Sequence, residues 1–85
     1  MGVGLMPTVR IRYFAIFREQ AGRDLEHVTT DAYSPSALYE ELQGRHHFTL
    51  PKRAIRVAIN NEFGSMETLL SDGDEVAFIA PVAGG

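Results

Sequence analysis

The closing stretch of the chain, Asp72 to Gly85, constrains its fold more than any other. It reads as a turn at Gly73, a strand over residues 75–79 and an end without large side chains that finishes in Gly84-Gly85. Glycine loses more conformational freedom on ordering than any other residue, so a folded domain gains little by ending on two of them. One chemically useful group remains there, the α-carboxylate of Gly85, on a segment thin enough to enter a narrow channel. We therefore expect this chain to present that carboxylate to another protein.

Length and composition indicate one small folded domain. The chain has 85 residues, of which 45% are hydrophobic and 22% are charged, as is typical of soluble proteins with a single core. We expect a loosely ordered extension over residues 1–7, a domain over residues 8–80 and a flexible tail over residues 81–85. The absence of cysteine excludes disulfides, a cysteine nucleophile and thiolate metal sites. Without a long apolar run or a signal-peptide pattern, the sequence predicts a cytoplasmic protein that does not enter a membrane.

The charge distribution bears on the kind of partner. A net charge of -3 argues against nucleic-acid binding, which needs a basic surplus. All eight Lys and Arg residues lie between Arg10 and Arg56, whereas five acidic residues and no basic ones follow Val57. An acidic half that carries the tail predicts a partner with a basic docking surface. The alternative is an acidic face that serves only solubility.

The first third of the chain predicts a pair of antiparallel strands. Residues 8–14 alternate, with Val9, Ile11 and Tyr13 on the side expected to face the core. Residues 15–22 predict a short polar loop or a single helical turn that closes at Gly22. Residues 25–30, rich in Val and Thr, predict the second strand.

The middle of the chain predicts one main helix. Ser34-Pro35 is a typical helix start, so we expect a helix over residues 35–43 that ends at Gly44, with Glu40 and Glu41 facing water. Residues 45–53 predict a connecting loop.

The last third predicts three further strands. Residues 55–60 predict a strand, residues 60–62 a turn and residues 63–66 a brief returning strand. Leu69 and Leu70 are expected to be buried in the crossover to the final strand at 75–79. Because Pro81 cannot donate to a ladder, pairing should stop near it.

This order of elements predicts an α+β fold of the β-grasp type. We expect a mixed sheet of about five strands, with the final strand beside the first and one main helix on one face. Strand parity then places Phe14 and Ile79 together on the face away from the helix. An apolar patch of this kind, rimmed by charged residues, is typical of a docking site. The alternative is a scatter of exposed apolar residues without a role.

Several stretches resemble the small subunit of molybdopterin synthase, a ubiquitin-like sulfur carrier of the MoaD/ThiS family. The resemblance covers residues 8–85 and is most specific in the closing run from Asp72 to Gly85. The matching stretches are Phe14-Ala15, Arg18-Glu19, Gly22, the helix from Ser34 to Leu42, Leu70 to Phe78 and Pro81 to Gly85.

The resemblance implies a sulfur carrier in molybdenum cofactor biosynthesis. In that family an adenylyltransferase related to ubiquitin activators uses ATP to adenylate the terminal carboxylate, here that of Gly85, which then becomes a thiocarboxylate. The tail enters the active site of a large subunit and donates sulfur to a pterin precursor, in an assembly of two small and two large subunits. The carrier itself then binds no cofactor or metal and needs no acid or base of its own.

The resemblance also implies which residues meet the partners. Its docking surface corresponds to Phe14, Phe63 and Ile79, of which Phe63 rests on the resemblance alone. Pro81, Val82 and Ala83 correspond to the inserted tail, and Gly84 and Gly85 to its reactive end.

Other functions remain open at this point. The adjacent His46 and His47 lack the spacing of metal ligands, and His27 is expected to be a packing or surface residue. A carrier for thiazole or another sulfur-containing product, or a modifier joined through Gly85 to lysines of target proteins, would use the same kind of tail.

Overall fold

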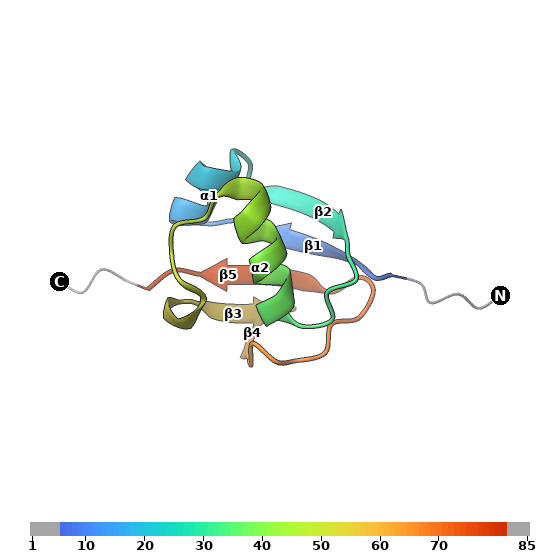
Figure 1. The fold of residues 1–85 in the computed structure, drawn as a ribbon. Helices are drawn as coiled ribbons and strands as arrows, with labels where there is room; N and C mark the ends of the chain where they lie inside the picture. The colour runs from blue at the N-terminus through green and yellow to red at the C-terminus, as the bar shows by residue number, and fades with distance from the viewer. Residues whose placement is uncertain (1–5, 82–85) are drawn as a thin grey trace.

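A five-stranded mixed sheet with a long helix across one face forms the domain (Figure 1). The computed structural model describes residues 6–81. Residues 1–5 of the extension expected over residues 1–7, and the tail residues Val82, Ala83, Gly84 and Gly85, lie outside the described residues.

The strands follow the predicted β-grasp topology. They are β1 (Thr8–Arg12), β2 (Leu25–Thr29), β3 (Arg56–Ile59), β4 (Glu62–Gly64) and β5 (Glu75–Ile79), and their order in the sheet is β2-β1-β5-β3-β4. β1 is antiparallel to β2 and parallel to β5, while β3 is antiparallel to both β4 and β5. The first and last strands therefore lie side by side inside the sheet, as the sequence predicts.

The helix α2 (Pro35–His46) begins as expected and ends later than expected. Ser34 Oγ accepts a hydrogen bond from the backbone N–H of Ala37 at 3.2 Å, and Pro35 occupies the first turn. The prediction that Gly44 ends the helix is wrong, because the left-handed cap is His47, with φ 60°. Contacts of the last helical turn with β2, described below, stabilise the extra residues.

Residues 15–22 are helical, which agrees with the second of the two expected forms, a polar loop or a helical turn that closes at Gly22, whereas the loop expected over residues 45–53 is partly helical. Residues 15–22 form α1 (Ala15–Ala21), which Gly22 ends with φ 76°, because Phe17 anchors the segment in the core. The expected loop over residues 45–53 includes the end of α2 and the start of a 3₁₀ helix, η1 (Lys52–Ala54). Between them, Phe48 is buried against Phe17 and Tyr39, so this stretch contributes to the core.

The core lies between the sheet and α2. The buried side chains of β1 alternate as predicted, whereas in β5 Ala77 is buried together with Val76 and Phe78. The buried residues of α2 share one stripe. Core members exposed by no more than 1% include Val9, Ile11, Tyr13, Val57, Val76, Phe78, Leu38, Tyr39 and Leu42. Burial raises the pKa of Tyr39, whose hydroxyl donates to the backbone carbonyl of Leu50 at 2.6 Å. Leu70 is buried as expected, but the same prediction for Leu69 is wrong, since 73% of it is exposed.

Tight turns set the ends of β3, β4 and β5. Asn60 and Asn61 have φ values of 53° and 71°, as a two-residue hairpin requires, and β4 covers residues 62–64 where residues 63–66 were expected. Gly73 has φ 88°, which few other residues tolerate, and its N–H donates to the carbonyl of Thr8 at 2.8 Å. This bond fastens the start of β5 to the start of β1.

Within residues 6–81, no helix combines the length and apolar character that crossing a bilayer would require.

Candidate functional site

The sheet face opposite α2, which we call the open face, carries the candidate docking residues. Residues paired across the sheet share a face, and the register aligns Leu25, Arg12, Ala77, Ala58 and Phe63 in one row from β2 to β4. Phe63 is 72% exposed in this row. Pairing thus provides an independent reason to place Phe63 with the docking residues that strand parity selected.

Phe14 and Ile79 lie on the open face, as strand parity predicts. Ile79 is two residues beyond Ala77 on β5 and is partly buried. Phe14 is two residues beyond Arg12 in extended backbone, where it forms the N-cap of α1 and is 46% exposed. The docking role of Phe14, Phe63 and Ile79 stays a prediction, but the fold gathers all three on one face.

Charged residues on the same face as the apolar docking residues form ion pairs with one another. Arg10 donates to Oε1 of Glu75 at 2.8 Å and Arg12 donates to Oε2 of the same carboxylate at 2.7 Å. Both arginines come from β1 and the glutamate from β5, so the ion pairs link the two parallel strands. The one carboxylate offsets half of the positive charge of the two arginines, so this group keeps a net charge of +1 in the middle of the open face.

The aspartates just before β5 do not lie beside the start of the tail. Asp72 and Asp74 lie at the start of β5, the end of the strand opposite Pro81, where they hold turns together. Asp72 accepts from the N–H of Thr8 at 2.8 Å, and Asp74 accepts from the N–H of Ser71 at 2.8 Å. Asp72 and Asp74 are close to the tail in sequence but not in space, because the whole length of β5 lies between them and Pro81.

The last described residues lead away from the sheet. β5 ends at Ile79, Ala80 still packs against the core, and Pro81 is exposed. Pairing therefore stops just before the proline, as predicted. The predicted tail contacts Val82 and Ala83 and the reactive Gly84 and Gly85 lie outside the described residues.

Comparisons with known proteins show the family to which the chain belongs. Residues 11–85 match the model of the ThiS family. The chain belongs to the ThiS family. It is 34% identical to the molybdopterin synthase sulfur carrier subunit of Escherichia coli and 32% identical to that of Haemophilus influenzae, each over 91% of this chain and 99% of the relative. Among solved structures it is similar to SAMP1 of Haloferax volcanii, with a TM-score of 0.72 and 26% identity over 92% of this chain and 99% of that chain.

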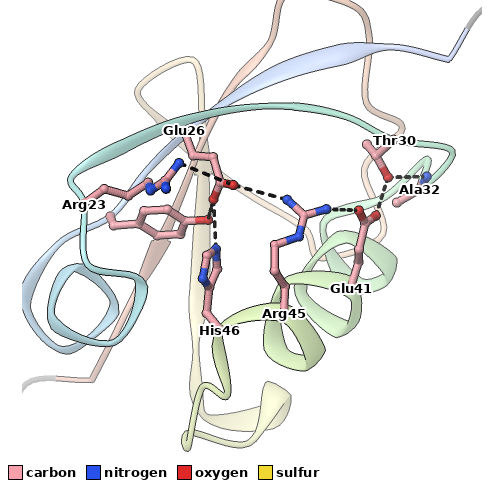
Figure 2. A network of polar contacts seen from close by, with 8 residues as sticks. Arg23, Glu26, Thr30, Ala32, Glu41, Arg45 and His46 are labelled. Atoms are coloured by element: carbon pink, nitrogen blue, oxygen red, sulfur yellow. Dashed lines mark hydrogen bonds and ion pairs between the residues drawn. The ribbon is translucent and has the colours of Figure 1, made fainter.

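This ThiS-family chain also contains a partly buried polar cluster on the helix side, centred on Glu26 (Figure 2). Glu26 Oε1 accepts from the Tyr13 hydroxyl at 2.7 Å and lies 2.9 Å from Nε2 of His46, while Oε2 accepts from Arg45 at 3.2 Å. Burial acts to raise the pKa of Glu26, but the hydrogen bonds from Tyr13 and His46 and the nearby positive charge outweigh it and lower the pKa. Burial, reinforced by the bond to Glu26, raises the pKa of Tyr13.

The cluster continues along α2 and explains why this helix is longer than expected. Arg45 donates to Glu41 at 3.0 Å, and Glu41 accepts from the hydroxyl of Thr30, which follows β2. Glu41 is therefore partly buried and does not simply face water, contrary to the prediction. One signal could have revealed the cluster: Glu26 has the same strand parity as the buried Val28, so it is an acid on the core side of β2.

The histidines of this family member have separate surroundings. His46 belongs to the Glu26 cluster and packs beside Tyr13 and Phe48, whereas His47 and His27 are exposed, with His27 opposite Arg10 on the open face. Across the described range 6–81, no group of three or more His, Cys, Asp or Glu side chains could hold a metal ion. The Glu26 cluster links β2 to α2 through the contacts of Glu26 with Arg45 and His46.

Proposed function

We propose that this protein is the sulfur carrier subunit of a molybdopterin synthase. The observation that carries the proposal is the match to two molybdopterin synthase sulfur carrier subunits over 91% of the chain, in a sequence that ends in Gly84-Gly85. The described domain supports it, because β5 lies inside the sheet and runs toward that end.

The chemistry requires only the terminal carboxylate from this chain. An oxygen of Gly85 attacks the α-phosphate of ATP, pyrophosphate leaves, and an acyl-adenylate forms. Hydrosulfide (HS⁻) then displaces AMP at the same carbonyl carbon and loses its proton, and the product is a thiocarboxylate. ATP is bound by an adenylyltransferase related to ubiquitin activators, so the carrier needs neither a cofactor nor a cysteine.

Sulfur donation takes place in a second complex. The carrier docks on a large synthase subunit, and the thiocarboxylate sulfur of Gly85 attacks an electrophilic carbon of a pterin precursor in the large subunit's active site. Water then hydrolyses the bond between the Gly85 carbonyl carbon and the sulfur, so the sulfur stays on the pterin and Gly85 regains its carboxylate. Two small and two large subunits form the assembly, and we place the reaction in the cytoplasm. The role of the carrier is to position its sulfur, which is how a chain without catalytic side chains contributes to rate.

The open face supplies the docking contacts in this proposal. Phe14, Phe63 and Ile79 bury apolar surface against the large subunit, and the tail enters its active site through Pro81, Val82 and Ala83. The apolar surface that these side chains expose in the free carrier supplies association energy. About 1.5–3 kcal/mol, the value for burying a fully exposed side chain, is the upper limit for each, because Phe14 and Ile79 are already partly covered.

Intact-mass measurement tests the proposal. The full-length protein is incubated with the activating enzyme, ATP and a sulfur source, and we expect a mass gain equal to one oxygen replaced by one sulfur. A variant lacking Gly85 should keep its fold and show no gain. If that truncated protein still acquired the sulfur, Gly85 would not be the carrier group.

A second candidate function is protein modification. It is favoured by the similarity to SAMP1, which another solved structure describes as small archaeal modifier protein 1. In that function lysine amines of target proteins would attack the activated Gly85 carbonyl. Conjugates of higher mass on a denaturing gel, formed with ATP and the activating enzyme, would support the modifier and are not expected from a carrier alone.

A further inference from the structure

Arg56 lies on the open face at the root of the tail. It is the first residue of β3 and pairs directly with Ile79, the last residue of β5. Directly opposite residues in an antiparallel pair have Cβ atoms about 4.5–5.5 Å apart, so the Arg56 side chain borders the proposed docking contact. Any protein that covers Ile79 and receives the residues after Pro81 must also meet Arg56.

The charge of Arg56 is not offset inside the described part of the molecule. Arg10 and Arg12 share Glu75, Lys52 contacts Glu40, and Arg45 binds Glu26 and Glu41. By contrast, within residues 6–81 no carboxylate lies within ion-pair distance of Arg56 or of Arg53, and both side chains are exposed. Arg53 belongs to η1, which immediately precedes β3.

The acidic residues of the last third do not offset this charge. Asp72, Asp74 and Glu75 lie at or before the start of β5 and are held by backbone N–H groups, Asn60 or the arginines of β1. Glu62 pairs with Ile59, at the end of β3 opposite Arg56, and Glu67 forms no ion pair within residues 6–81. Arg53 and Arg56 are therefore positive charges without a described ion-pair partner where β5 finishes, although the net charge of the chain is -3.

We propose that Arg56, with Arg53, forms a basic strip that pairs with carboxylates on the large subunit beside its tail entrance. The proposal rests on the proposed function, since the partner is the protein that covers the open face. An arginine guanidinium is matched in geometry to a carboxylate, and complementary charge at the rim of an apolar contact speeds association and sets its orientation. The partner surface is thus acidic, the opposite of what the sequence order of charges suggests.

Binding of the full-length protein to the large subunit from the same organism tests this. We expect Arg56→Gln to raise Kd about threefold to tenfold at low salt, and Arg56→Glu to raise it further, because exposed charge pairs contribute little each and a reversed charge repels. At about 500 mM NaCl the Kd values of Arg56→Gln and the wild type should converge, since salt screens exposed charges.

A matched control separates local charge from net charge. Asn61→Asp changes the net charge by the same amount as Arg56→Gln, but at the hairpin turn beyond the other end of β3, so its Kd should equal that of the wild type. Unfolding in urea should be unchanged in both variants, because both sites are exposed.

The outcomes distinguish this inference from the proposed function. If Phe14→Arg weakens binding and Arg56→Gln does not, the docking face stands and the acidic partner surface is overturned. If the wild-type protein does not bind the large subunit at all, the proposed function fails and this inference fails with it.

Discussion

The two faces of the sheet are built from the same strands, but one face is covered by α2 and the other is open. On the helix side Val9, Ile11, Val76 and Phe78 are at most 1% exposed, and they pack beneath α2 (Figure 1). On the open face the alternate residues of the same strands include Arg10, Arg12 and Glu75, flanked by the exposed Phe14. Because successive side chains of a strand point to opposite faces, neighbouring residues can serve stability and docking separately.

The largest expected difference between the faces is in stability. Phe78→Ala should lower the free energy of unfolding by about 3–5 kcal/mol, because it removes a buried ring that packs on Tyr39 and leaves a cavity. Phe63→Ala, the matched change on the open face, should lower it by less than about 0.5 kcal/mol. Urea unfolding at neutral pH measures both, and similar losses for the two variants would contradict the division between the faces.

A smaller effect is expected from the polar cluster on the helix side. Glu26→Gln should lower the free energy of unfolding by about 1–3 kcal/mol at neutral pH, because Tyr13, His46 and Arg45 lose a charged acceptor. The folded-state pKa of Glu26 lies below its unfolded value, so its contribution is fully present above the unfolded pKa of about 4.3 and is lost as pH falls through the folded pKa.

Unfolding curves recorded from neutral pH down through this acidic range test the direction of the pH dependence. The difference in free energy of unfolding between the wild type and Glu26→Gln should become smaller as the pH falls. Glu62→Gln, on the exposed edge strand, is the control and should leave the profile unchanged. A gap that stays constant into acid would mean that the ionised form of Glu26 does not stabilise the fold.

Local rules in the sequence predicted the β-grasp fold well because short-range chemistry decides most of its elements. Ser34 and Pro35 set the start of α2. Asn60 and Asn61 adopt the positive φ values of the hairpin turn, and Gly73 adopts the positive φ of the turn before β5. Each of these needs only the residue itself and its neighbours in sequence.

The predictions that failed depend on contacts between distant segments. α2 continues past Gly44 because Arg45 and His46 bind Glu26 on β2, which is 20 positions away from His46. Residues 45–53 are not a simple loop because Phe48 packs in the core. Of the pair Leu69 and Leu70, only Leu70 is buried, and its backbone N–H donates to the carbonyl of Tyr33. No local pattern contains these pairings.

The candidate site shows the same division. Strand parity was sufficient to place Phe14 and Ile79, whereas Phe63 required the β3–β4 register. For the charges, sequence order does not show that Asp72 and Asp74 lie at the opposite end of β5 from Pro81.

The most direct test of the central claim measures stability and docking in a single variant, Phe14→Arg. Phe14 is 46% exposed on the open face, so the variant should unfold at the same urea concentration as the wild type while its complex with the large subunit is lost in gel filtration. An equally stable variant that still forms the complex would contradict the account, because docking would then not use the open face.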